Sequence, residues 1–321
     1  MNRRPHTTTA ILAALGLVVG ALWTGITQAE ETAKTKSPAY TEHGADSCIK
    51  CHDELSEYPV FDIFKTKHAV MGDKRTPMAR LQCETCHGPG SLHADMSIKE
   101  GEKRPRVRAF GRGSPTPVAE QNGVCLGCHD NHERANWKGS IHQSEEVACA
   151  DCHTIHTARD HVLTVREQPA VCYRCHPRQR AETYLASTHP LRYGQMACSD
   201  CHDVHDASLG PNLLKRPTIN ETCYQCHAEK RGPFLWEHAP VTEDCTLCHL
   251  PHGSNHPDLL TRSPTLLCQQ CHSQAGHPSV SYTRDGLPGG APSAFLLGKS
   301  CLNCHSEIHG SNHPSGIRLS R

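Results

Sequence analysis

One short motif, C-x-x-C-H, occurs ten times in this chain of 321 residues. Each copy has two cysteines three positions apart and a histidine directly after the second. The cysteines are Cys48, Cys51, Cys83, Cys86, Cys125, Cys128, Cys149, Cys152, Cys172, Cys175, Cys198, Cys201, Cys223, Cys226, Cys245, Cys248, Cys268, Cys271, Cys301 and Cys304. The histidines are His52, His87, His129, His153, His176, His202, His227, His249, His272 and His305. All 20 cysteines are used, so none is left for a disulfide or a nucleophile.

The motif is the signature of covalent haem attachment. Two thiols at this spacing can add to the two vinyl groups of one haem, and the adjacent imidazole can bind its iron as the proximal ligand. We therefore expect ten c-type haems (haem c, iron). Zinc would pair two C-x-x-C knuckles without a histidine after each, and a redox dithiol needs one C-x-x-C on a βαβ unit.

The other histidines are candidates for the second axial position on each iron. Of 26 histidines, ten belong to the motifs and His6 lies in the N-terminal leader. Ten recur at repeating offsets, namely His68, His93, His142, His156, His189, His205, His238, His252, His277 and His309. Five are spare: His43, His132, His161, His256 and His313.

This repetition predicts bis-histidine ligation throughout. Four methionines after the leader are too few to replace the set. A histidine that closely follows a motif, such as His252, leaves the chain on the proximal side of its own haem and should reach a neighbouring one. His309 competes with His313 for one position.

The composition excludes a conventional large core, because aromatic residues make up 5% of the chain and it contains 24 glycines and 22 prolines. We predict a multihaem cytochrome c fold, mostly irregular coil with short α-helices and negligible β-structure. Two-motif units begin at 125, 172, 223 and 268, and a divergent one at 48, which is the periodicity of five two-haem repeats. Helices longer than two turns are expected only near 176–187 and 227–237.

Residues 1–29 have the pattern of a cleaved export signal: a basic start, an apolar run over 10–26 and a small-residue end at Ala29. A membrane anchor is the alternative, but the run is short for a full span. The mature chain is expected in the periplasm.

The 31 basic and 33 acidic residues of the mature chain, with haem propionates added, argue against nucleic acid as a partner. The basic stretch 99–112 is interpreted as a solvated linker, with pairing to propionates as the alternative.

Several longer strings carry a family resemblance. They are GADSCIKCH at 44–52, LQCETCHGP at 81–89, ACSDCH at 197–202, TCYQCHAEKRGPFLWEHAPVTEDC at 222–245, LCQQCHS at 267–273 and SCLNCHSEIHGSNHPSG at 300–316. The chain resembles the MtrA-type family (MtrA, MtoA, PioA and DmsE), periplasmic decahaem c-type cytochromes of outer-membrane porin–cytochrome complexes. The resemblance covers nearly all of the mature chain and is weakest at 30–43, 99–118 and 278–298.

The resemblance implies an elongated chain of ten haems in two pentahaem modules, 30–190 for haems 1–5 and 191–321 for haems 6–10. It implies three kinds of partner: an outer-membrane β-barrel porin, an outer-surface multihaem cytochrome, and periplasmic or inner-membrane electron carriers. The expected function is conduction of electrons across the outer membrane by haem-to-haem hopping, in metal reduction or iron(II) oxidation. No open haem and no catalytic residue is evident, so an enzyme is not expected. A reductase of a small oxyanion and a free periplasmic shuttle remain alternatives.

Overall fold

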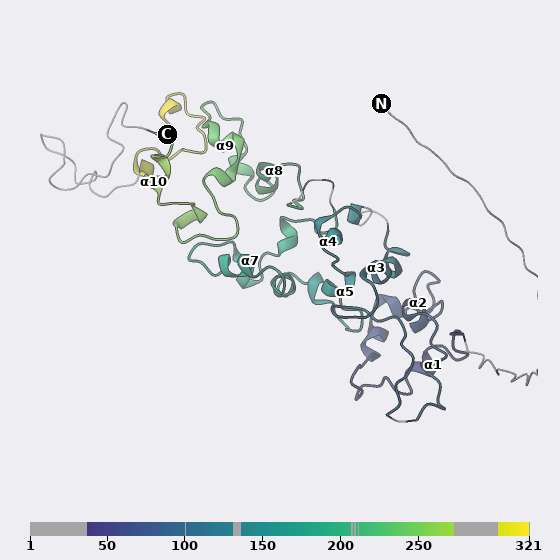
Figure 1. Cartoon of the computed structure of the whole chain (residues 1–321). Helices are drawn as coiled ribbons and strands as arrows, with labels where there is room; N and C mark the ends of the chain where they lie inside the picture. Colours follow the sequence, from purple (N-terminus) through teal and green to yellow (C-terminus); the bar gives the residue numbers. More distant parts are fainter. Residues whose placement is uncertain are drawn as a thin grey trace, which may run out of the picture. The chain divides into compact units, whose positions relative to one another are not determined.

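Short helical turns joined by irregular segments make up the part of the chain that the structure describes (Figure 1). The structure is a computed structural model and describes residues 37–99, 101–130, 136–206, 208, 210, 212–272 and 301–320. The predicted export signal at 1–29, the candidate ligand His277 and the spare His132 lie outside these residues.

Each α-helix has between four and nine residues. They are α1 (Ala45–Cys48), α2 (Cys83–His87), α3 (Val118–Leu126), α4 (Ile141–Ser144), α5 (Cys149–Cys152), α6 (Gln168–Cys172), α7 (Pro177–Glu182), α8 (Ile219–Cys223), α9 (Ala239–Glu243) and α10 (Pro264–Cys268). The 3₁₀ turns are η1 (Phe61–Lys65), η2 (Lys67–Ala69), η4 (His161–Leu163), η5 (Pro190–Tyr193), η6 (Cys198–Asp200), η7 (Ala228–Lys230), η8 (Cys245–Leu247), η9 (Pro257–Leu259), η12 (Cys301–Asn303) and η13 (Gly316–Arg318).

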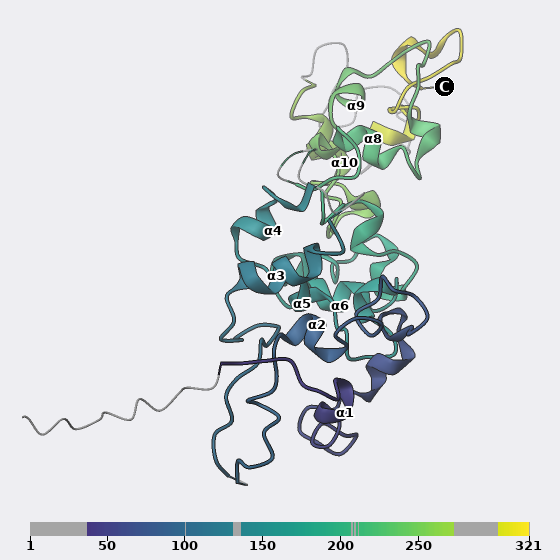
Figure 2. The ribbon, with the colours of Figure 1, turned by 90° about the vertical axis from the view of Figure 1, so that its right-hand side faces the viewer.

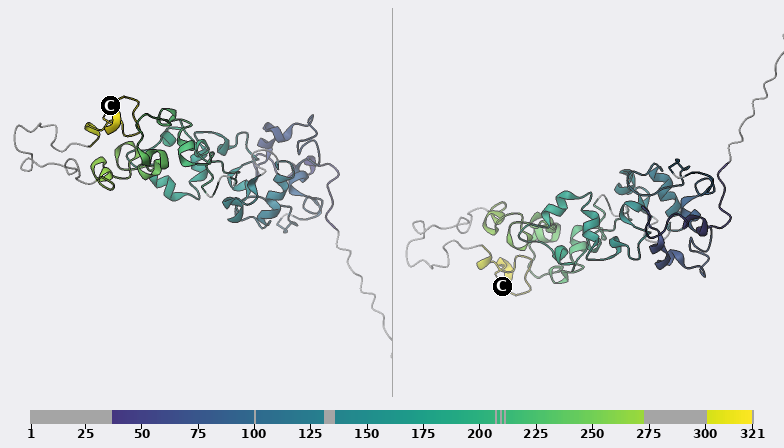
Figure 3. Two further views of the ribbon diagram at one scale, coloured as in Figure 1. Left: turned by 90° about the horizontal axis from the view of Figure 1, so that it is seen from above. Right: turned by 90° about the horizontal axis from the view of Figure 1, so that it is seen from below.

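Pairing between extended segments is limited to isolated β-bridges in the described residues: Ser187 with Ser254, His202 with Leu214, Trp236 with Ser311, and His249 with Leu260. Neither view in Figure 3 contains a sheet within these residues. The predicted fold class, a multihaem cytochrome of coil and short helices, is confirmed.

The predicted positions of the helices longer than two turns are wrong. The segment 176–187 holds α7, whose six residues make fewer than two turns, and 227–237 contains only the three-residue turn η7. In the described residues the longest helix is α3, with nine residues. After η7 and Arg231, the chain continues with Gly232, at φ +70°, and Pro233. Proline lacks the N–H that would continue a helix, so the turn ends before them.

The two motifs of each repeat pack against one another. Contacts join α1 with α2, α3 with α5, α6 with η6, α8 with η8 and α10 with η12. Figures 1 and 2 show α3 and α5 side by side as an example. These are the five two-motif units that the periodicity indicates.

Side-chain amides, two buried and one half-buried, hold three of these pairs together. The Asn122 side chain accepts the N–H of Cys149 at 2.8 Å and donates to the carbonyl of Val147 at 3.0 Å. Asn220 repeats this arrangement, accepting the N–H of Cys245 at 2.8 Å. Gln168 accepts the N–H of Ser199 at 2.8 Å in the third repeat. The amides thus link the start of one motif to the start of the next.

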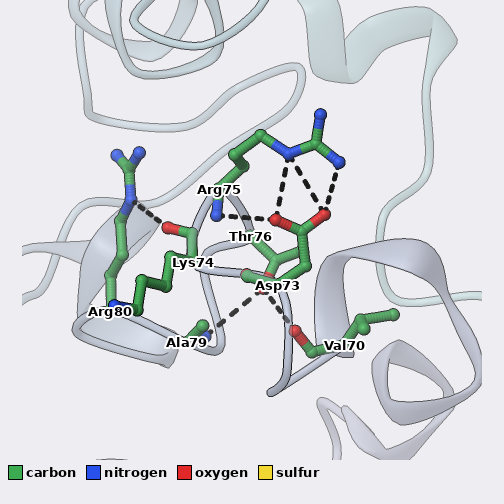
Figure 4. Close-up of polar contacts among 7 residues, drawn as sticks. All are labelled: Val70, Asp73, Lys74, Arg75, Thr76, Ala79 and Arg80. Carbon is green, nitrogen blue, oxygen red and sulfur yellow. Dashed lines mark hydrogen bonds and ion pairs between the residues drawn. The ribbon is translucent and has the colours of Figure 1, made fainter.

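Few large apolar side chains are buried in the described residues; they are Met78, Trp137, Leu213 and Leu260. Local polar contacts hold many of the loops in place. The loop that separates His68 from Cys83 is an example (Figure 4): the Arg75 guanidinium forks onto Asp73, with 2.7 Å between Nη2 and Oδ2, and the Thr76 hydroxyl donates to the Val70 carbonyl at 2.8 Å. Arg80 Nε donates to the Lys74 carbonyl at 3.1 Å.

Residues Pro38–Arg321 form one compact unit. The predicted module boundary at 190 falls within it and stays a prediction. Among the helices of the described segments, none combines the length and the apolar character that crossing a bilayer requires.

Candidate haem sites

Each C-x-x-C-H motif closes into a single helical turn. The N–H of the motif histidine bonds to the carbonyl of the first cysteine, at 2.9 Å for His129, His153 and His272 and at 3.0–3.1 Å for six of the others. Residues three and four apart share a face of a helix. The turn therefore presents both thiols and the imidazole on the same side, as one haem requires.

Within each repeat, the first cysteines of the two motifs are neighbours. The Cys48 thiol is hydrogen-bonded with the Cys83 thiol, which raises the pKa of Cys48 and lowers that of Cys83 to about 7. The same contact joins Cys125 with Cys149, Cys172 with Cys198, Cys223 with Cys245, and Cys268 with Cys301. The two haem sites of a repeat are therefore adjacent.

Between repeats, the second cysteines come together. Burial raises the pKa of Cys86 to about 11, and the charges of Cys125 and Cys128 in the next repeat add to the effect. The pKa values of Cys152, Cys201 and Cys248 are likewise raised by burial, with smaller contributions from Cys175, Cys226 and Cys271 respectively. Contacts within and between repeats thus alternate, and consecutive motifs in the sequence are consecutive neighbours in space.

Nine motif histidines each face one histidine of the predicted distal set. Ring centroids lie 5.9–6.4 Å apart in the pairs His52–His93, His87–His156, His129–His68, His153–His205, His176–His142, His202–His252, His227–His189, His249–His309 and His272–His238. No histidine occurs in two of these pairs. The tenth motif histidine is His305, and the tenth candidate, His277, lies outside the described residues.

This ring separation fits one iron between two imidazoles. A metal–imidazole bond is about 2 Å long, so two such bonds and the ring nitrogens' distances from their ring centres add to about 6 Å. Rings that touch one another directly by stacking lie closer, face to face. The side chains therefore fit haem iron.

The second ring nitrogens support the same interpretation. Nδ1 donates to a backbone carbonyl in seven of the candidate ligands, at 2.7–3.0 Å: His87 to Arg108, His93 to Pro105, His189 to Pro251, His202 to Asn212, His238 to Ile308, His249 to Asp258 and His305 to Arg318. Such a bond fixes the tautomer that leaves Nε2 free for a metal.

Burial also favours the neutral form, which is the form that binds metal, in several of these imidazoles. It lowers the pKa of His68, His87, His142, His156, His252 and His309. The spare histidines in the described residues lie elsewhere. His161 contacts Glu167, His313 contacts Ser315, and His43 is exposed.

The basic stretch 99–112 is not a free linker. The carbonyls of Pro105 and Arg108 are the acceptors for His93 and His87, and the Arg104 guanidinium donates back to the carbonyls of His93 and Asp95. Sequence reasoning missed these acceptors because any residue supplies a backbone carbonyl, so composition holds no signal for them.

Comparison with known proteins identifies the family of this chain. The doubled CXXCH motif profile matches residues 189–232 and 238–277, and a cytochrome c-type protein NrfB-like profile matches 83–170. Multiheme cytochrome MtrA of Shewanella baltica is 49% identical over 88% of this chain and 83% of its own length. The chain belongs to the MtrA family of multihaem cytochromes.

A second relative is cytochrome c-type protein NrfB of Escherichia coli, 30% identical over 53% of this chain and 88% of its own length. Like the MtrA-family proteins, this chain binds c-type haem at paired C-x-x-C-H motifs and carries electrons. When bound, each haem supplies a one-electron iron couple. The protein supplies the thiols, the two imidazoles and the groups that orient them.

Proposed function

We propose that this chain is a periplasmic decahaem cytochrome that conducts electrons across the outer membrane within a porin–cytochrome complex. The observation that carries the proposal is the pairing of nine motif histidines with nine distal candidates. Two strong-field imidazoles on every iron leave no open position for a substrate, which suits a conductor rather than an enzyme.

The ligand set follows from the ring pairs. Each motif histidine is the proximal ligand of its own haem, and its ring partner is the distal ligand. His277 is the remaining member of the distal set and is assigned to the haem of His305. His309, rather than His313, serves the haem of His249, since its ring is 6.2 Å from the His249 ring.

The order of the sites supports conduction along the array. First cysteines meet within a repeat and second cysteines meet between repeats, so each haem between the first and the tenth has a neighbour on two sides. Electron transfer then proceeds site by site in sequence order. In eight of the nine pairs the two histidines come from different repeats, and His52–His93 joins the two motifs of the first repeat, so the pairs link neighbouring sites along the chain.

The partners and location come from the family resemblance and from residues 1–29. We propose export by a cleaved signal, an outer-membrane β-barrel porin around the protein, an outer-surface multihaem cytochrome at one end, and periplasmic or inner-membrane carriers at the other. The proposed extracellular process is metal reduction or iron(II) oxidation.

Electron paramagnetic resonance of the oxidised, purified protein, with haem iron quantified, tests the ligand set. Ten low-spin haems per chain are expected. A stoichiometric high-spin haem would favour a reductase with one open iron. Detergent extraction of outer membranes tests the partner: the protein should co-purify with a β-barrel, whereas recovery only from the soluble periplasm would favour a free shuttle.

A further inference from the structure

The candidate ligand His153 has a side-chain carboxylate as its hydrogen-bond partner. Seven ligand histidines donate Nδ1–H to neutral backbone carbonyls, but His153 donates to the Asp160 carboxylate, with 2.7 Å between Nδ1 and Oδ2. The ring of His153 faces His205 at 6.0 Å, so this is the proximal side of the fourth haem site.

Asp160 is held in place for this contact. It caps η4, where its Oδ1 accepts the N–H of Val162 at 3.4 Å, and the same oxygen accepts the N–H of Thr154 at 3.3 Å. The other oxygen, Oδ2, faces the imidazole. The Asp160 side chain is 13% exposed and that of His153 is 28% exposed, so the pair is largely shielded from water.

Within the described residues, Glu182 and Glu229 also lie near ligand histidines, but in weaker arrangements. Glu182 lies 3.3 Å from Nδ1 of His252, and its second oxygen accepts a 2.8 Å bond from Arg178, which draws its charge away. Glu229 lies 3.8 Å from Nδ1 of His227, and both side chains are more than half exposed. The Asp160 contact is the shortest of the three and the most enclosed.

We propose that Asp160 is a positioning residue that lowers the reduction potential of the fourth haem. The proposal rests on the proposed function, in which His153 is an axial ligand. A carboxylate acceptor raises the basicity of a metal-bound imidazole more than a neutral carbonyl does. A more basic imidazole stabilises Fe(III) relative to Fe(II), so uptake of one electron becomes less favourable at this site.

For conduction, the consequence is a change in the free energy of the transferred electron at the fourth site of the array. The thiol contacts place the fourth site between the third, through Cys125 and Cys149, and the fifth, through Cys152 and Cys175. Lowering this potential raises the free energy of an electron on the fourth site. Transfer onto the fourth site therefore becomes less favourable, and transfer from it to the third or fifth site becomes more favourable.

The test uses the full-length, haem-loaded protein with Asp160→Asn, which keeps an acceptor oxygen but removes the charge. Asp258→Asn is the matched control, because His249 bonds to the backbone carbonyl of Asp258 rather than to its carboxylate. Potentiometric titration monitored by electron paramagnetic resonance is the readout. Removing a carboxylate of this kind should change the equilibrium constant for reduction of that iron about tenfold. For a one-electron couple, this corresponds to an upward shift of about 59 mV in the potential of one haem of the ten.

Asp258→Asn should shift no potential by as much as Asp160→Asn does, because the backbone carbonyl that bonds to His249 is retained. Asp160→Ser is a second variant, which keeps a capping side chain for η4 if the asparagine variant loads haem poorly. An unchanged titration in both Asp160 variants, with all haems still low-spin, overturns the inference and leaves the proposed function intact. If the wild-type protein instead shows a high-spin haem that His205→Ala does not change, the ligand assignment fails and the inference fails with it.

Discussion

The ring of each histidine that closely follows a motif faces a motif elsewhere in the chain. His252 follows His249 by three residues, yet its ring lies 6.2 Å from His202. His205 similarly faces His153. The direction in which each of these side chains points therefore determines which motif it pairs with.

Replacing His205 by alanine should leave one iron with a single imidazole. We expect one haem of the ten to change from low-spin to high-spin, measured by electron paramagnetic resonance on oxidised protein. His161→Ala is the control, because His161 contacts Glu167 instead of a motif histidine. Equal spectra for the two variants would contradict the assignment of His205.

The choice between His309 and His313 gives a second residue-level prediction. His309 faces His249, whereas Nδ1 of His313 lies 2.9 Å from the Ser315 hydroxyl. We expect His309→Ala to produce one high-spin haem and His313→Ala to produce none. The reverse result would assign the ligand to His313.

At the scale of the elements, buried amides replace the apolar packing that most helices use. Asn220 should be important, because its side chain bonds both the N–H of Cys245 and the carbonyl of Val241. Asn220→Ala leaves those buried groups unpaired, at a cost of about 1–3 kcal/mol. Chemical denaturation followed by circular dichroism in the haem absorption band should show the loss. Asn303→Ala, at an exposed asparagine, should have little effect.

The loop in Figure 4 predicts a response to acid. The side-chain hydrogen bond from Arg75 lowers the pKa of Asp73 from its ordinary 3.8 to about 2. A lowered folded-state pKa means that the contribution is present above about pH 4 and is lost as the pH falls through about 2. Hydrogen exchange across 70–80, corrected for intrinsic rates, should rise over this window.

Asp73→Ala should remove that pH dependence by loosening the loop at every pH. Asp62→Ala breaks a separate exposed ion pair with Lys65 and serves as the control. Unchanged exchange across 70–80 in Asp73→Ala would show that the fork onto Arg75 does not hold the loop.

Much of the local structure could be predicted from the sequence, because C-x-x-C-H only works as a turn with its thiols on one face. The five motif pairs follow from periodicity in the same way. The carbonyl acceptors could not be predicted, nor could Asp160 be told apart from other aspartates. Their role depends on which loop packs against which imidazole, and no residue type in the sequence indicates that packing.

For the whole molecule, the ring pairs cross the predicted module boundary at 190. His153 lies before it and His205 after it, and His189 lies before it while His227 follows. The two modules are therefore predicted to share ligands at two irons. On this prediction, each half needs a histidine of the other to complete one of its own sites.

A protease site inserted at the exposed Gln195 tests this in the folded, haem-loaded protein. After cleavage, the two halves should elute together in size-exclusion chromatography, because His153–His205 and His189–His227 still join them. In the His205→Ala, His189→Ala double variant, the same cut should weaken the association. Separation of the halves in the unsubstituted protein would show that the modules are independent.

The direction of the ring pairs also sets an order in time. The partners of His129, His176, His227 and His272 are upstream in the chain, at His68, His142, His189 and His238, whereas those of His87, His153, His202 and His249 are downstream. For a chain exported from its N-terminus, the first group of sites has both imidazoles as soon as its motif emerges. The second group must wait until most of another repeat has followed, so maturation alternates between sites completed at once and sites completed later.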